Sequence, residues 1–153
     1  KVYRNFIGST LNAWNDPSKG IELAINQIER GADVIFAAAG GSGIGVYQAV
    51  HDANVLAIGV DSNQNALQPG NMLTSMVKRL GHAVYDSVLD YKQGQWQAKS
   101  IVYGLSGDWL ALARDNNNKA IYTEPLADKI MTIKQHIIEK KIILVDLSDA
   151  QCH

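Results

Sequence analysis

Residue types that build metal, redox or nucleic-acid sites are scarce in this sequence. Only one of its 153 residues is a cysteine, Cys152, which excludes a disulfide framework and a cysteine-based metal site. The four histidines are scattered and form no HxxH or HxH pair. Lys and Arg number 14 against 15 for Asp and Glu, and a net charge of −1 argues against a nucleic-acid-binding surface. No cofactor, metal or nucleic-acid partner is expected.

Long apolar runs are also missing. The longest weakly polar stretch, VIFAAAGGSGIGV (34–46), is too short and too rich in glycine to span a bilayer. An apolar content of 46% and a charged content of 19% are ordinary for a globular domain. A chain of this length suits one domain or one large lobe.

What the sequence does contain is an alternation of strand-like and helix-like segments. Continuous apolar runs at 33–39 and 55–61 indicate strands that are buried on both faces. Residues 43–53 between them predict a helix, and residues 72–78 predict the next strand. Strands and helices that alternate with short connections predict βαβ units and a parallel α/β sheet.

The flanking segments extend this pattern. KVYRNFIG (1–8) alternates and is rich in β-branched and aromatic residues, which predicts a first strand. Asp16 followed by Pro17 predicts the start of a helix that ends near Gly31. Further predicted elements are helices at about 80–92 and 126–137, short strands at 100–105 and 108–114, and a terminal strand or extended tail at 141–147.

Three loops should meet at one edge of this sheet, because open parallel sheets bind ligands beyond the carboxyl ends of their strands. The loops contain Trp14, the glycines of GGSGIG (40–45), and Asp61. An indole can stack on a flat ring, a glycine backbone allows close approach, and a carboxylate can accept two vicinal hydroxyls. Lys78 ends the next strand, where it could pair with Asp61 or reach a hydroxyl.

Each of these residues also has a simpler interpretation. The glycines fit a dinucleotide fingerprint only in part, since Val46 stands where the third glycine is needed, and they could form a structural turn instead. Trp14 could pack in the core, Asp61 could cap the SNQN turn, and Lys78 could be an ordinary exposed lysine. No set of nucleophile, base and orienting group is found, so no enzyme is expected.

Several stretches together resemble one known family. NDPSKGIELAINQIERGADVIFAAAGGSGIGVYQAV, AIGVDSNQN and LTSMVKR are similar to the basic membrane proteins, the substrate-binding lipoproteins of ABC importers for purine nucleosides. The similarity spans most of residues 1–93 and continues more loosely to about 147. It implies one α/β lobe, with a parallel sheet in three layers, of a type I periplasmic-binding-protein fold, and a nucleoside held between two such lobes.

The resemblance also implies site residues and a place in the cell. Trp14 would stack on the base, Gly40 would lie beside the ligand, Asp61 would bind the ribose hydroxyls, and Lys78 would lie near that acid. The protein would be a periplasmic or extracytoplasmic membrane-anchored lipoprotein with an ABC permease as partner.

About half of the family's chain has no counterpart here, so residues 1–153 form a single lobe. Segments 79–95 and 120–153 would normally contact a first lobe, and the apolar face at Leu80, Val84, Val88 and Tyr91 would need another partner. We therefore expect self-association. The alternatives are a repurposed module with weak or no ligand binding and a nucleotide-cofactor domain.

Overall fold

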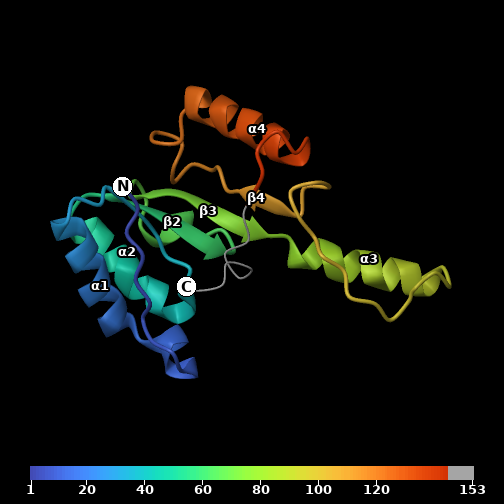
Figure 1. Cartoon of the computed structure of the whole chain (residues 1–153), viewed down its shortest axis with the longest axis horizontal. Helices are drawn as coiled ribbons and strands as arrows, with labels where there is room; N and C mark the ends of the chain where they lie inside the picture. The colour runs from blue at the N-terminus through green and yellow to red at the C-terminus, as the bar shows by residue number, and fades with distance from the viewer. Residues whose placement is uncertain (145–153) are drawn as a thin grey trace.

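Four strands form one sheet in the order β1-β2-β3-β4. The computed structural model describes residues 1–144 (Figure 1). The strands are β1 (Val34–Phe36), β2 (Leu56–Asp61), β3 (Met72–Lys78) and β4 (Leu110–Leu112). β1, β2 and β3 pair in parallel, and β4 adds to β3 in antiparallel orientation. The predicted α/β class with a parallel sheet is confirmed, as is a short strand within 108–114, which is antiparallel to β3.

Helices occupy both sides of this sheet. Figure 1 shows α1 and α2 together on one side and α4 on the other. The helices are α1 (Pro17–Glu29), α2 (Gly43–Asp52), α3 (Leu80–Lys92) and α4 (Glu124–Ile138), with short 3-10 helices η1 (Leu11–Asn15), η2 (Gly40–Ser42) and η3 (Asn65–Leu67). α1 begins as the sequence predicts, since the Asp16 carboxylate accepts a hydrogen bond of 2.9 Å from the Lys19 backbone N–H.

The core lies between α1, α2 and the three parallel strands. Helix α2 contributes Tyr47 and Val50, and the strands contribute Ala57 and Met72, all of them buried. Glycine at position 45 allows α1 and α2 to approach each other closely. A Cβ atom at Gly45 would lie 1.9 Å from the Pro17 carbonyl oxygen, which no side chain could tolerate. The glycine-rich stretch is therefore needed for the packing of α1 against α2, whether or not it also contacts a ligand.

A buried polar cluster fastens the segment after β4 to the sheet. Asn118 is 1% exposed, and its Nδ2 donates to the Leu73 and Ala113 carbonyls at 2.9 and 3.0 Å. Asn65 Nδ2 donates to Asp115 Oδ2 at 3.1 Å. Hydrogen bonds from Asn63 and from nearby backbone hold the pKa of Asp115 below its ordinary value. The NNN stretch at 116–118 therefore anchors a loop.

Two predicted strands are absent. Residues 1–8 run extended but form no strand, because β1 pairs only with β2 and a wide groove separates it from this segment. Residues 100–105 form no strand, and β4 pairs only with β3. Of the predicted terminal strand at 141–147, residues 141–144 are not strand, and 145–147 lie outside the described residues.

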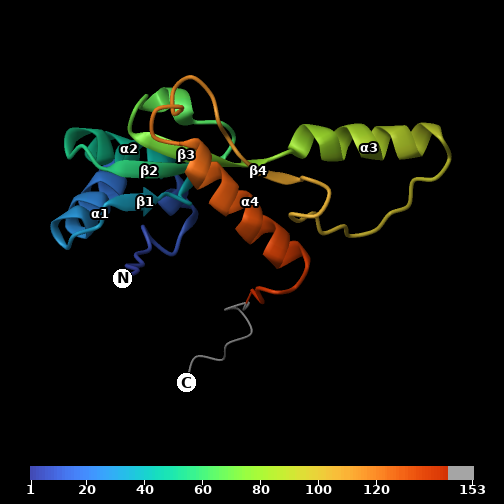
Figure 2. The ribbon, with the colours of Figure 1, turned by 90° about the horizontal axis from the view of Figure 1, so that it is seen from above.

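Helix α3 projects from the sheet as an arm (Figures 1 and 2). It has no buried residue, and Val84 and Tyr91 are 64% and 73% exposed. The apolar face predicted from the sequence is thus uncovered in the described part of the chain. No helix within residues 1–144 has the length and apolar character needed to cross a membrane.

Candidate functional site

Trp14 and Gly40 touch each other at the rim of the sheet. Gly40 has a φ of +56°, and a Cβ atom there would lie 3.2 Å from Trp14 Cε3 and 3.1 Å from the Trp14 carbonyl oxygen. The left-handed backbone therefore favours glycine at position 40, and any side chain there would press tightly against Trp14. The Trp14 side chain remains 58% exposed, so the indole is not a core residue and can offer one face to a ligand.

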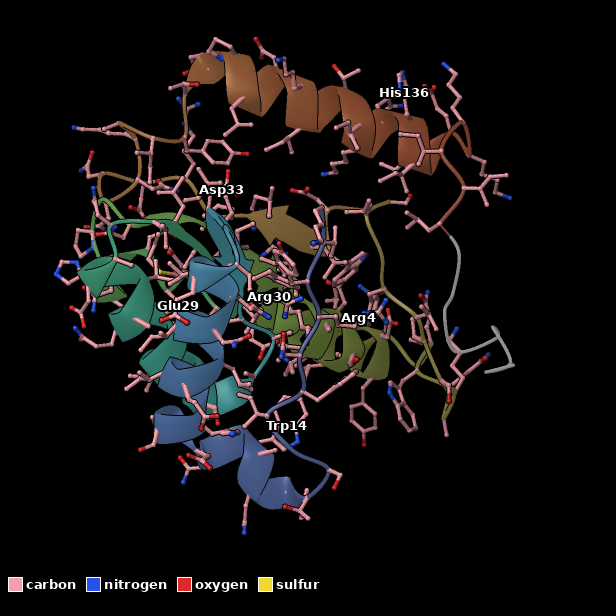
Figure 3. The ribbon with its side chains drawn as sticks, turned by 60° about the vertical axis from the view of Figure 1, so that its left-hand side comes forward. Arg4, Trp14, Glu29, Arg30, Asp33 and His136 are labelled. Atoms are coloured by element: carbon pink, nitrogen blue, oxygen red, sulfur yellow. The ribbon has the colours of Figure 1, made fainter. Side chains whose placement is uncertain are left out.

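Ser42 holds η1, which carries Trp14, against the glycine turn. Its hydroxyl donates to the Ala13 carbonyl at 2.7 Å and accepts from the Asp16 N–H at 2.6 Å. The side chain is fully buried, so both contacts are shielded from water. Figure 3 shows Trp14 at the end of the first segment, far from His136 on α4.

Asp61 and Lys78 form an ion pair at the ends of neighbouring strands. Lys78 Nζ lies 2.6 Å from Asp61 Oδ1, and the two side chains are 49% and 56% exposed. The sequence suggested this pairing, since β2 and β3 end side by side. Asp61 adopts a φ of +68°, a conformation that costs energy for any residue with a side chain and that aspartate tolerates better than most.

The turn after Asp61 is held by other side chains. Asn63 Oδ1 accepts from the Asn65 N–H at 3.0 Å, and Gln64 Oε1 accepts from the Val60 N–H at 2.9 Å. The interpretation of Asp61 as the cap of this turn is therefore not supported. Its carboxylate faces Lys78 and solvent, where a ligand can reach it.

Tyr47, which the sequence did not single out as a site residue, links the glycine turn to the Asp61 loop. Its hydroxyl donates to Gln64 Oε1 at 2.7 Å and would lie 3.3 Å from a Cβ atom at Gly43. Burial and the negative charge of Asp61 raise the pKa of Tyr47 to about 12. The sequence did contain a signal for this contact. It has a tyrosine one turn after the glycine-rich start of a helix, and a glutamine just beyond the next strand.

The rim thus combines an exposed indole, a left-handed glycine backbone and a carboxylate oriented by a lysine. These groups can stack on a ring and accept hydrogen bonds from hydroxyls. Residues 1–144 contain no group of three or more His, Cys, Asp or Glu side chains that could hold a metal ion.

Comparison with known proteins identifies the family. Residues 7–148 match the model of the Bmp family, described as "ABC transporter substrate-binding protein PnrA-like". This chain belongs to the Bmp family. Basic membrane protein D of Borreliella burgdorferi is 34% identical over 142 residues, covering 90% of this chain and 40% of that protein. An uncharacterized lipoprotein of Pyrococcus abyssi is 32% identical over 98 residues, covering 60% of this chain and 24% of that protein.

Solved structures agree on the fold. A solute-binding protein of an ABC transporter system from Aeropyrum pernix superposes with a TM-score of 0.71 at 22% identity, over 86% of this chain and 45% of that one. A transcriptional activator of the comK gene from Bacillus halodurans superposes at 0.76 with 19% identity, over 88% and 47%. The Bmp chain thus has the fold of periplasmic-binding proteins and spans about 40% of basic membrane protein D.

Family membership bears on two sequence-based expectations. Bmp proteins are substrate-binding proteins, which supports a solute-binding role and speaks against an enzyme. The roles assigned to Trp14, Gly40, Asp61 and Lys78 stay predictions, although the contacts bring them together in two pairs.

Proposed function

We propose that this chain is the solute-binding lobe of an ABC importer component, and that its ligand is a purine nucleoside or a related ribosyl compound. The observation that carries the proposal is the Asp61 carboxylate, accessible at the end of β2 and held by Lys78 at 2.6 Å. A carboxylate fixed in one orientation can accept hydrogen bonds from two vicinal hydroxyls, which a ribose presents.

The other half of the ligand would be bound by Trp14. Its exposed indole rests on the Gly40 backbone, which fixes the position of the ring before a ligand arrives. A purine base could stack on the free face, and the glycine leaves room for the base to approach the main chain. Ser42 contributes indirectly, because it holds η1 in place.

The setting of the protein follows from its relatives. Some of them are named lipoproteins, and the family is defined by ABC transport, so we propose an extracytoplasmic, membrane-anchored protein that delivers its ligand to a permease. A second lobe would close over the ligand and exclude water, as ligand pockets usually require.

Calorimetric titration with adenosine tests the proposal through the ribose hydroxyls. Asp61→Asn keeps a side chain that tolerates positive φ but removes the charge, so binding should weaken about tenfold. The same titration with 2′,3′-dideoxyadenosine should show no further loss in Asp61→Asn, because the two changes remove one interaction. Asp52→Asn, on an exposed aspartate at the end of α2, is the matched control.

A stacking test uses two partly exposed tryptophans. Trp14→Leu should weaken adenosine binding by roughly 1 to 3 kcal/mol, as expected for loss of an aromatic stack. Trp96→Leu, on a tryptophan that is 52% exposed beyond α3, should leave it unchanged. Equal adenosine affinity in Trp14→Leu, Asp61→Asn and the unmodified chain would remove both residues from the site.

One observation favours a second candidate, a module that self-associates and binds ligand weakly or not at all. The apolar face of α3, formed by Leu80, Val84, Val88 and Tyr91, is uncovered in the described structure. A stable oligomer that shows no thermal shift with any purine nucleoside would favour this candidate.

A further inference from the structure

The backbone at Asp61 forms a tight turn of a strained kind. The Ser62 N–H donates to the Val60 carbonyl at 2.8 Å, and the residue between them, Asp61, has a φ of +68°. A hydrogen bond that spans one residue of positive φ defines the strained form of the γ-turn, which is rare in proteins. Such a conformation persists only where neighbouring groups hold it in place. The direction of the Asp61 carboxylate therefore depends on those groups.

The sheet holds this turn from one side only, because β3 pairs with β2 to its end whereas β1 stops short of it. The Leu56 N–H donates to the Asp33 carbonyl at 3.0 Å, and alternate residues of a parallel strand bond to the same neighbour, so Val60 directs its N–H to the side of β1. The carbonyl that would come next on that side, Ala37, accepts from the Ala39 N–H at 2.9 Å instead. Val60 is 5% exposed, and a buried N–H needs an acceptor.

Gln64 supplies that acceptor. Its Oε1 accepts from the Val60 N–H at 2.9 Å, in the place of a strand carbonyl. The Gln64 N–H donates to Ser75 Oγ on β3 at 3.0 Å, so the main chain and the side chain of this residue are both attached to the sheet. Glycine at position 59 makes room for the amide, since a Cβ atom there would lie 2.8 Å from Gln64 Oε1. The Gln64 side chain thus folds back over β2 and holds the start of the turn.

Tyr47 fixes the position of this amide. Its hydroxyl donates to the same oxygen, Gln64 Oε1, at 2.7 Å. The two donors occupy both lone pairs of the amide oxygen, so the side chain cannot rotate without losing two hydrogen bonds. Tyr47 is itself 2% exposed in the core, and its bond to Gln64 is shielded from water. The position of Gln64 is therefore set by the packed body of the molecule.

We propose that Gln64 is a positioning residue for the ribose end of the site, and that its side chain, fixed by Tyr47, holds the Asp61 carboxylate in the direction that accepts two hydroxyls. The inference rests on the proposed function and adds to it a residue that acts through the main chain. The ion pair with Lys78 is about half exposed, and exposed ion pairs hold side chains only weakly in water. Loss of the Gln64 acceptor should let Asp61 relax to a negative φ, which redirects its carboxylate.

NMR of the ligand-free chain tests the conformation directly. A positive φ brings the amide proton and the Hα of one residue close together, so Asp61 should give a strong intraresidue cross-peak in a NOESY spectrum. Gln64→Met keeps the length of the side chain but removes the acceptor, and should weaken this cross-peak to that of an extended residue. Gln64→Glu keeps an acceptor oxygen and should retain it. Gln68→Met, on the partly buried glutamine at the other end of η3, is the matched control and should also retain it.

Calorimetric titration tests whether this conformation matters for the ligand. The unmodified chain should bind adenosine about tenfold more tightly than 2′,3′-dideoxyadenosine, and in Gln64→Met this preference should fall to about twofold or less, because a misdirected carboxylate gains little from the hydroxyls. A role in stability alone would weaken both ligands by the same factor and leave the preference unchanged.

Tyr47→Phe provides a milder form of both measurements, and carries them if Gln64→Met does not fold. It removes the donor that fixes Gln64 but leaves the bond from Val60. The Asp61 cross-peak should weaken in part, and the preference for adenosine should lie between those of the unmodified chain and Gln64→Met.

Three outcomes would overturn the proposal. The first is a strong Asp61 cross-peak in Gln64→Met. The second is a cross-peak that is lost equally in Gln68→Met or in Gln64→Glu, which would make the change a general effect of substitution in this loop. The third is an unchanged preference for adenosine in both Gln64→Met and Tyr47→Phe. No adenosine binding by the unmodified chain would contradict the proposed ligand, and the cross-peak would then decide by itself whether Gln64 holds Asp61.

Discussion

The body of the molecule (residues 17–78) and the arm (residues 80–109) both contain helices with a periodic apolar pattern. They differ in how much of the apolar surface is buried against other elements. Among residues 1–144, every buried apolar side chain except Tyr122 lies in the body, whereas no residue from Met76 to Asn117 is buried. Helix α3 has 13 residues, a length at which isolated helices are marginal in water. The comparison teaches that a periodic apolar pattern specifies a helix and its face, but the stability of that helix depends on what covers the face.

The largest expected difference is in the free energy of unfolding of two Gly→Ala variants, one in the body and one in the arm. Gly45→Ala would place a Cβ atom 1.9 Å from the Pro17 carbonyl oxygen and should force α1 and α2 apart, at a cost of about 3 kcal/mol in the free energy of unfolding. Gly81→Ala, on α3 with nothing within 4 Å, should cost nothing and should raise local helix stability by up to about 1 kcal/mol. Urea denaturation followed by circular dichroism measures both.

Equal stability changes in these two alanine variants would mean that the body and the arm do not differ in packing. The contact between α1 and α2 through Gly45 would then not limit the stability of the core.

A smaller effect concerns pH and the buried tyrosine. Because burial and Asp61 raise the pKa of Tyr47 from 10.0 to about 12, the folded state favours the neutral phenol. Its contribution is complete below pH 10 and is lost as the pH rises to about 12, which lowers the free energy of unfolding by roughly 2 to 3 kcal/mol. Thermal unfolding between pH 9 and 12 measures this slope.

Two Tyr→Phe variants, one in the body and one in the arm, test whether Tyr47 is the group that titrates. Tyr47→Phe should be less stable at neutral pH, since Gln64 loses its donor, and should show a flatter alkaline slope. Tyr85→Phe, on the exposed face of α3, should keep the slope of the unmodified chain. An unchanged slope in Tyr47→Phe would show that another group titrates.

The smallest effect on stability concerns the arm itself. The double variant Val84→Glu, Val88→Lys should abolish self-association and change the free energy of unfolding by less than about 0.5 kcal/mol, because both side chains are already exposed. Light scattering over a range of concentrations measures the first, and urea denaturation the second. A monodisperse monomer of the unmodified chain at every concentration would contradict the predicted self-association.

Much of the body could be predicted from the sequence, because its strands are continuous apolar runs and its helices have clear boundaries. Asp16 and Pro17 gave the start of α1, and the pairing of Lys78 with Asp61 followed from two adjacent strand ends. The predicted strands at 1–8 and 100–105 were wrong because alternation reports a tendency to be extended, whereas a strand also needs a neighbour with free hydrogen-bonding groups.

Other features lay beyond the reach of local patterns. The role of Tyr47 depends on its hydrogen bond to Gln64, which lies beyond the next strand and meets Tyr47 only in the folded chain. The clash expected at Gly45 arises from the close crossing of α1 and α2, and nothing in the spacing of the glycines reveals it. The roles of Trp14, Gly40, Asp61 and Lys78 in ligand binding stay predictions for the titrations to test.

The backbone at Asp61 limits how this protein could be re-engineered for a different cargo. Its φ of +68° is acceptable to glycine, asparagine and aspartate, and strains larger or β-branched residues. Glycine, asparagine and aspartate are therefore best suited to position 61, and of these only aspartate carries a charge. Under the proposed function, changes of specificity are better sought at Trp14, whose helical backbone would accept many other side chains.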